Sequence, residues 1–454
     1  MDTVLLLPRL LVPVLPRFQI LEQMAVVIEG ESIIAVLPRS AALSAYENAA
    51  RVELPEHVLV PGFINMHTHS AMTLLRGYAD DLNLQVWLNE HIWPVEKSFL
   101  GPEYVHDGSK LAIAEMLRGG TTFFNDLYFY PEVTAAAAVE AGMRACIGLP
   151  VIDVPTIWAS SEDECIDKGL AISASWQDEP LLTTSFAPHA PYSVGDTALA
   201  RIAELSEMRD MRVHMHVLES SWEIGESLRK HGKPTLDRLA DIGLLNERLL
   251  AVHMTQLNGT DLEALSRAAV NIIHCPESNL KLGNGICPLA RLLEHNINVA
   301  LGTDGAASNN DLDLLGESRT AALLAKGVSA DPCVVTAFQA LEMLTINAAK
   351  ALGKSDRLGS IEVGKLADMC AIRMGSLQTT PMYDVVSHLI YAASSQQVSH
   401  VWVGGQLLLE NSEFLHMDVS EIIDRANYWA ERIATENGSL KSVKTDKLQG
   451  VQAS

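Results

Sequence analysis

The chain has 454 residues, 48% of them hydrophobic, so it can form one large domain with a smaller companion. Its 33 Lys and Arg against 56 Asp and Glu give a net charge of -23, which disfavours nucleic acid and anionic membranes as partners. Six scattered cysteines without a CxxC pair, and no apolar run long enough to span a bilayer, predict a reduced cytoplasmic protein. We further expect a homo-oligomer.

Residues 1 to about 60 alternate short apolar runs with turn residues, a pattern typical of antiparallel strands. A similar pattern returns in residues 359–372 and 398–409. Two such segments from opposite parts of the chain can pair in one sheet. We therefore predict a small β-sandwich domain built from residues 1–60 and 358–415.

Between these segments, strand-like apolar runs alternate with amphipathic stretches that suit helices. The predicted strands are residues 63–66, 121–125, 144–152, 181–186, 212–217, 249–253, 270–273 and 299–302. This alternation predicts a (β/α)8 TIM barrel over residues 61–357, with its site at the C-terminal ends of the strands. An open doubly wound sheet has the same alternation, but no GxGxxG follows the early strands. One helix is predicted over residues 334–352, and a C-terminal helix with a flexible tail over 416–454.

Polar side chains stand at the ends of five predicted strands. The first strand ends His67-Thr68-His69, and in an extended strand the two imidazoles point to the same face. Alone, this pair equally fits a strand that ends in two hydrogen-bonded polar residues. The other four ends carry His189, His216 with Glu219, His253 and Asp304. Because the ends of barrel strands meet at one face, we expect these residues to form one site.

Three imidazoles and one carboxylate match the donors that Zn²⁺ or Fe²⁺ accepts, with room left for water. The predicted metal ligands are His67, His69, His216 and Asp304. Glu219 lies just past the strand, where its carboxylate can act as a general base without binding the ion. We expect His253 to hydrogen-bond the attacking group, and His214, deeper in its strand, to be structural.

Three segments carry a family resemblance: residues 61–69 (PGFINMHTH), 216–219 (HVLE) and 301–310 (LGTDGAASNN). Through them the chain resembles the amidohydrolase superfamily and, within it, the 5'-methylthioadenosine/S-adenosylhomocysteine deaminases, over nearly its whole length. Some superfamily members bridge two metals with a carboxylated lysine on strand four. Here His189 stands in that region and no lysine does, so the resemblance implies one divalent ion, zinc with iron as the alternative.

The resemblance also implies the contacts of a purine nucleoside. Trp87 and Glu96 match the family's tryptophan and glutamate that line the site, and His189 matches the histidine that contacts the purine. The resemblance further implies that Glu219 and Asp304 contact the substrate. Without the resemblance, Trp87 is equally a packing aromatic and Glu96 a helix-surface acid.

The implied reaction is hydrolytic loss of the 6-amino group of an adenine nucleoside. Glu219 would carry a proton from water to purine N1, His253 would orient the attack, and Asp304 would pass the remaining proton to the leaving ammonia. Family members that accept adenosylhomocysteine supply arginine after strand three, whereas residues 145–158 contain no Arg or Lys. This difference favours methylthioadenosine as substrate over adenosylhomocysteine, because a buried carboxylate needs a cation.

Two other classes of function also fit the motifs. A triazine hydrolase or an oxoguanine or cytosine deaminase would share the scaffold, but its substrate has no ribose diol for Glu96 to hold. A barrel with a purely structural metal would be no enzyme and would have no use for Glu219. The cytidine-type deaminases need HxE with PCxxC, which this sequence lacks.

Overall fold

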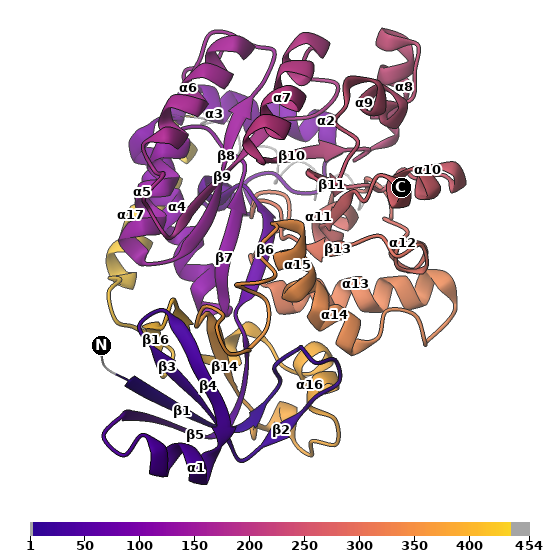
Figure 1. Cartoon of the computed structure of the whole chain (residues 1–454). Coiled ribbons are helices and arrows are strands. Elements are labelled where there is room, and N and C mark those ends of the chain that lie inside the picture. Colours follow the sequence, from indigo (N-terminus) through magenta and orange to yellow (C-terminus); the bar gives the residue numbers. More distant parts are fainter. Residues whose placement is uncertain (1–2, 437–454) are drawn as a thin grey trace, which may run out of the picture.

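The computed structural model describes residues 3–436 and contains two sheets that lie at opposite ends of the molecule (Figure 1). One sheet has eight parallel strands that neighbour each other in sequence order. Its strands are β6 (Phe63–Thr68), β7 (Thr121–Asp126), β8 (Arg144–Val151), β9 (Leu182–Pro188), β10 (Arg212–Val217), β11 (Leu249–His253), β12 (Asn271–His274) and β13 (Val299–Leu301). Each overlaps one predicted strand, so the eightfold alternation is confirmed.

The first and last of these strands meet and nearly close a barrel. The backbone N–H of Asp304 donates to the carbonyl of His67 at 2.9 Å, and Asn65 Nδ2 donates to Thr303 Oγ1 at 2.8 Å. Gly302 permits this approach, because a Cβ atom there would lie 2.7 Å from the backbone nitrogen of His67. The predicted TIM barrel is confirmed, and its closure places the ends of β6 and β13 side by side.

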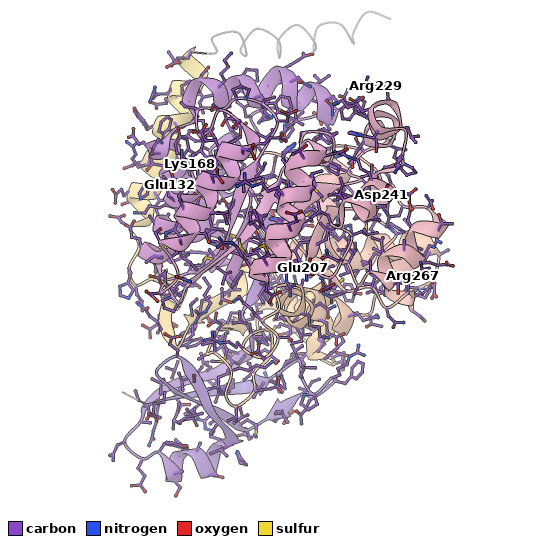
Figure 2. The ribbon with its side chains drawn as sticks, turned by 45° about the horizontal axis from the view of Figure 1, so that its top comes forward. Glu132, Lys168, Glu207, Arg229, Asp241 and Arg267 are labelled. Atoms are coloured by element: carbon purple, nitrogen blue, oxygen red, sulfur yellow. The ribbon has the colours of Figure 1, made fainter. Side chains whose placement is uncertain are left out.

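Helices surround the barrel (Figure 1). They are α4 (Pro102–Arg118), α5 (Pro131–Ala141), α6 (Glu162–Ala174), α7 (Asp196–Arg209), α8 (Ser221–His231), α9 (Thr235–Ile242), α10 (Gly259–Arg267), α11 (Pro276–Lys281), α12 (Leu289–Glu294) and α13 (Leu314–Ser329). Figure 2 shows charged residues on the outer helices, among them the exposed Glu207, Asp241 and Arg267. The prediction of one helix over residues 334–352 is wrong: Thr345, with φ -130° and ψ -95°, separates α14 (Ala337–Leu344) from α15 (Ile346–Ala351).

The second sheet combines strands from both ends of the described chain. Its strands are β1 (Thr3–Leu11), β2 (Leu21–Glu22), β3 (Met24–Glu29), β4 (Ser32–Pro38), β5 (Ala50–Pro61), β14 (Met369–Arg373), β15 (Val398–Val403), β16 (Gln406–Glu410) and β17 (Glu413–Phe414). The two halves join where β5 pairs antiparallel with β14, with Val60 opposite Cys370. The predicted composite β domain is confirmed, while the predicted domain boundaries stay predictions. Two short helices, α1 (Arg39–Ala45) and α16 (Val385–Tyr391), complete this end of the molecule.

The last described helix, α17 (Val419–Glu436), lies along the barrel helix α4 (Figure 1). Arg425 Nε and Trp429 Nε1 both donate to Asp107 Oδ2 at 2.8 Å. The polar tail predicted after this helix lies outside the described residues. Within residues 3–436, no helix combines the length and apolar character needed to cross a membrane.

A helical segment connects β6 to α4 and covers the C-terminal end of the barrel. After the short η1 (Ser70–Leu75), the segment runs continuously through α2 (Leu84–Val86), η2 (Trp87–Ile92) and α3 (Trp93–Phe99). Its buried side chains form a hydrophobic cluster with Tyr104 of α4 and Trp429 of α17. We call residues 84–99 the covering helix.

Candidate active site

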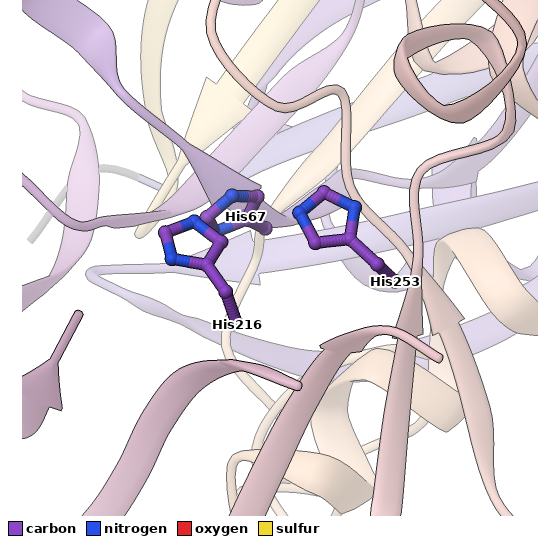
Figure 3. A group of neighbouring side chains, drawn as sticks. All are labelled: His67, His216 and His253. Atoms are coloured by element: carbon purple, nitrogen blue, oxygen red, sulfur yellow. The ribbon is translucent and has the colours of Figure 1, made fainter. Parts of the chain in front are cut away.

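Four imidazoles meet at the C-terminal end of the barrel. His67 comes from β6, His69 directly follows that strand, His216 comes from β10 and His253 from β11. Figure 3 shows His67, His216 and His253 pointing toward one another. The ring centroids of His67 and His216 lie 4.9 Å apart, and those of His67 and His69 lie 4.8 Å apart. The predicted histidines therefore lie within one cluster.

Each of these imidazoles is anchored through Nδ1, which leaves Nε2 facing the centre of the cluster. The anchoring pairs are His67 Nδ1 with His214 Nε2 (2.8 Å), His69 Nδ1 with Leu127 O (2.5 Å), His216 Nδ1 with His189 O (2.6 Å) and His253 Nδ1 with Asn279 Oδ1 (2.9 Å). Such anchoring fixes the tautomer and orients a histidine for metal binding. His214 thus has the structural position predicted for it.

Asp304 completes the cluster from the loop after β13. Its Oδ1 lies 3.3 Å from Nε2 of both His67 and His69, and Ser278 Oγ donates to its Oδ2 at 2.6 Å. In a tetrahedral zinc site with bonds of about 2.1 Å, two ligand atoms lie about 3.4 Å apart. The 3.3 Å distances from Asp304 Oδ1 to the two imidazole nitrogens therefore match the spacing of zinc ligands.

His67 Nε2 tests whether the cluster fits a metal ion. The atom is fully buried and, although it lies 3.3 Å from Asp304 Oδ1, makes no well-aligned hydrogen bond among the described residues. An unpaired buried nitrogen is costly, and a metal ion would satisfy it. The ligand atoms of His67, His69 and Asp304 lie within 4.8 Å of one another, as do those of His67, His216 and His253. The donor set therefore fits a divalent ion.

Glu219 reaches the same space from just beyond β10. Asn284 Nδ2 donates to its Oε1 at 2.9 Å, and His253 Nε2 lies 3.8 Å from that oxygen. Burial, followed by the charge of Asp304, raises the pKa of Glu219 to about 8. The raised pKa makes this carboxylate, held next to the cluster, a stronger proton acceptor.

Four residues at the strand ends adopt left-handed backbone conformations: Leu218 (φ 51°), His253 (φ 76°), Met254 (φ 51°) and Asp304 (φ 61°). Residues other than glycine rarely adopt this conformation, and such strain is concentrated at functional sites. At Leu218 the turn is supported by Glu223, whose Oε2 accepts a hydrogen bond from the backbone N–H of Glu219 at 3.1 Å.

A pocket opens from the cluster toward the covering helix and encloses about 820 Å³, counting its open mouth. This volume is within the range of small-molecule sites. Trp87, Glu96, His189, Glu219 and Asp304 all line it, so the residues predicted to contact substrate share one cavity. The remaining walls are mainly apolar, and no Lys or Arg is among the described residues that line the pocket.

Glu96 lies on the wall of this pocket with its side chain buried. Tyr128 Oη donates to Glu96 Oε1 at 2.6 Å. Burial raises the pKa of Glu96 to about 7, although the hydrogen bond from Tyr128 lowers it in part. Glu96 is thus not the helix-surface acid of the alternative interpretation.

Sequence reasoning missed the polar residues that hold this site together. They are Tyr128, Glu223, Ser278, Asn279 and Asn284. Ser278 and Asn279 follow β12, a strand whose end was not among the five expected to carry polar site residues. The signal that could have found them is the run His274-Cys275-Pro276-Glu277-Ser278-Asn279 at the end of a buried apolar strand.

Comparison with known proteins gives related sequences over most of the chain. A model of the amidohydrolase family matches residues 58–408. The 5-methylthioadenosine/S-adenosylhomocysteine deaminase of Teredinibacter turnerae is 45% identical over 426 residues, which cover 94% of this chain and 96% of that protein. The 5'-deoxyadenosine deaminase of Methanosarcina acetivorans is 41% identical over 391 residues, covering 85% and 89%.

Solved structures agree with the sequence comparison. An adenosine deaminase from Xanthomonas campestris with bound zinc has a TM-score of 0.94 and 46% identity, covering 96% of this chain and 99% of that chain. An atrazine chlorohydrolase from Arthrobacter aurescens TC1, also with zinc, has a TM-score of 0.85 but 24% identity, over 94% and 100% of the two chains. At that identity the second likeness concerns the fold alone.

Proposed function

The chain belongs to the amidohydrolase family, and we propose that it is a metal-dependent deaminase of adenosine-type nucleosides. The reaction is hydrolysis of the bond between purine C6 and its amino group, with release of ammonia and a 6-oxo nucleoside. The observation that carries this proposal is one pocket that joins the imidazole and carboxylate cluster to Trp87 and Glu96. The names of the related deaminases support the same reaction.

We propose one divalent ion, zinc, with His67, His69, His216 and Asp304 as its ligands. The unpaired Nε2 of His67 and the zinc in a related deaminase structure support this assignment. When bound, the ion supplies a Lewis acid that lowers the pKa of water toward about 7.

Three side chains would take part in the reaction, two of them by transferring protons. Glu219 takes a proton from the attacking water and delivers it to purine N1, which makes C6 electrophilic. His253, anchored by Asn279, orients the attack on C6. Asp304 passes the second proton to the amino group, which leaves as ammonia. The distance of 3.8 Å between His253 Nε2 and Glu219 Oε1 supports their action at one reacting centre.

The pocket walls would hold the nucleoside. Glu96 accepts hydrogen bonds from the two ribose hydroxyls, and Tyr128 keeps its carboxyl group in position. Trp87 and His189 contact the sugar and the purine. Because no cation lines the pocket among the described residues, the carboxylate of a homocysteine tail would be buried unpaired. We therefore propose nucleosides with an apolar 5' group, such as methylthioadenosine, as the preferred substrates.

We also propose a cytoplasmic homo-oligomer. The six cysteines are unpaired, which supports a reducing compartment. Leu323 and Val328 on α13 are more than half exposed, which supports a contact with a second copy of the chain. Cell fractionation and sedimentation at several protein concentrations would test the two proposals.

The test is an ammonia-release screen of methylthioadenosine, 5'-deoxyadenosine, adenosine, adenosylhomocysteine, guanine and cytosine, with metal content measured on the same sample. We expect turnover of the adenine nucleosides, about one zinc per chain, and the highest kcat/KM with an apolar 5' group. Equal kcat/KM for adenosylhomocysteine would contradict the proposed preference, and turnover of a free base alone would contradict the function.

Replacing Glu219 by Gln distinguishes an enzyme from a barrel with a structural metal. Glutamine keeps the hydrogen bond to Asn284 but cannot carry a proton, so kcat should fall by about 10² to 10⁴. Metal content should be unchanged, because Glu219 is not a proposed ligand. Unchanged turnover would contradict the mechanism.

A further inference from the structure

The covering helix contains one turn that is wider than an α-helical turn. Before this turn, the backbone N–H of Trp87 donates to the carbonyl of Asn83, four residues back. Within it, the N–H of Trp93 donates to the carbonyl of Leu88, five residues back. Residues 87–92 thus form a π-turn, which accommodates one residue more than the α-helix around it.

The additional residue changes which side chains share a face of the helix. Trp87 and Glu96 are nine residues apart, so in a regular α-helix they would point about 180° away from each other. The wider π-turn takes up one additional residue. The angle between the two side chains about the helix axis then equals that of residues eight apart in an α-helix, about 80°. Both can then line the same pocket, as they do.

The burial pattern fits the π-turn and not an uninterrupted α-helix. The buried residues are Leu84, Trp87, Leu88, Ile92, Val95, Glu96 and Phe99. Viewed down the axis of an uninterrupted α-helix, these side chains would cover an arc of about 180°. When the π-turn takes up one residue, the arc narrows to about 120°. Ser98 is exposed, yet an uninterrupted α-helix would place it within the buried stripe.

Pro94 gives the π-turn a cause in the sequence. Inside an α-helix, a proline lacks the N–H donor and its ring clashes with the carbonyl four residues earlier, here that of Glu90. A wider turn moves this carbonyl away from the ring. The α-helix then restarts at Trp93 with Pro94 in its first turn, where no N–H donor is needed.

We propose that the π-turn at residues 87–92, favoured by Pro94, is a positioning element that sets nucleoside affinity by turning Trp87 and Glu96 toward the same pocket. This inference rests on the proposed function, which assigns both side chains to the nucleoside. It adds a condition on the length of the chain between them. The number of residues between Trp87 and Glu96 determines whether Glu96 faces the ribose.

The test compares changes in helix length at different places. One alanine inserted between Asn89 and Glu90 turns Glu96 by a further ~100° and should raise KM for methylthioadenosine at least ~10-fold, with kcat within ~3-fold. Deleting Glu90 together with Pro94→Ala gives a regular α-helix in which Trp87 and Glu96 keep their relation. This variant should keep KM within ~3-fold of the unmodified protein.

Two further variants isolate the register from the general cost of altering the helix. An alanine inserted between the exposed Lys97 and Ser98 lengthens the same helix beyond Glu96 and should leave KM unchanged. Deleting Glu90 alone leaves Pro94 inside a regular α-helix, so its thermal midpoint should be lower than that of the deletion with Pro94→Ala.

The outcomes separate the inference from the proposed function. If the unmodified protein releases no ammonia from any nucleoside, the proposed function fails. If it does, an insertion at residue 89 that leaves KM unchanged overturns the inference alone. The inference is also overturned if the variant without Glu90 and with Pro94→Ala folds and binds metal, but has a KM raised as much as in the variant with alanine inserted after Asn89.

Discussion

His216 and His253 occupy similar positions but are expected to differ in their effect on metal binding. Their rings are stacked 5.4 Å apart, and His67, His216 and His253 could together hold an ion. His253 Nε2 also lies 3.8 Å from the Glu219 carboxylate, where it can orient the attack on substrate. We therefore propose His216 as a ligand and His253 as an orienting group.

Replacing each of these histidines by Asn tests the assignment. His216→Asn should lose most of its zinc, because removing one of four ligands weakens a metal site strongly. His253→Asn should keep its zinc while kcat falls by about 10² or more. The measurements are metal content by mass spectrometry and ammonia release. Equal loss of zinc in both variants would make His253 a ligand.

Glu96 should make nucleoside affinity depend on pH. Burial raises the pKa of its carboxyl group to about 7, so the ionised form, the better acceptor for two ribose hydroxyls, becomes dominant only above that pH. KM for methylthioadenosine should fall as pH rises from 6 to 8. Glu96→Gln should remove this dependence and raise KM at pH 8 by about 10-fold.

A 2',3'-dideoxynucleoside is the control for Glu96. It has no ribose diol, so its KM should hardly change on replacement of Glu96 by Gln. A similar loss of affinity for both nucleosides would mean that Glu96 acts on pocket shape and not through the hydroxyls.

The residues proposed to touch the ion or substrate were easier to find from the sequence than the residues that hold them. His67 and His69 share a strand face and end an apolar run, so periodicity and fold class sufficed. Tyr128 donates a hydrogen bond to Glu96, and Asn284 donates one to Glu219. In both pairs the partners come from different segments of the chain, and no spacing in the sequence relates them. Such contacts arise only when the barrel closes.

Helix α8 holds the proposed general base, Glu219, through Glu223. This residue is 1% exposed, and its carboxylate accepts the backbone N–H of Glu219 next to the strained Leu218. Burial raises the pKa of Glu223 to about 8, so a neutral amide can replace its protonated form.

We expect Glu223→Gln to retain activity and Glu223→Leu to lower kcat by about 10-fold or more, because only the leucine removes the acceptor that holds Glu219. Zinc content should be unchanged in both variants. Glu226→Ala, one turn further along and paired with Arg229, is the matched control and should leave kcat unchanged. An active Glu223→Leu variant would contradict this role.

At the scale of elements, the strands were predictable because each is a short apolar run between turn residues. The irregularities within the helices could not be predicted in the same way. The break at Thr345 depends on one residue's backbone angles, inside a run of helix-forming residues. The π-turn was missed for a related reason, since a search at 3.6 residues per turn does not allow for one wider turn.

The barrel and the mixed sheet are joined by a buried ion pair between Arg144 of β8 and Asp368. Arg144 Nε donates to Asp368 Oδ2 at 2.8 Å, and the two side chains are 4% and 3% exposed. Asp368 Oδ1 also accepts the N–H of Gly404. Removing only the cation would leave a buried carboxylate without its partner.

Arg144→Met should therefore lower the free energy of unfolding by about 3 to 5 kcal/mol in urea denaturation. Adding Asp368→Asn should recover part of this loss, because the amide oxygen still accepts from Gly404. The control is Arg201→Ala, which removes pairs with the exposed Asp163 and Asp167 and should cost less than about 1 kcal/mol. An equal cost for Arg144 and Arg201 would contradict the importance of burial.

The pairing of β5 with β14 has a consequence for synthesis of the protein. Residues 58–61 of β5 precede the barrel and residues 369–372 of β14 follow it, so one edge of β5 stays unpaired while the whole barrel is translated. An open apolar strand edge is a site of aggregation. We therefore expect the N-terminal strands to need protection by a chaperone, or transient pairing of their own, until the ribosome has released β14.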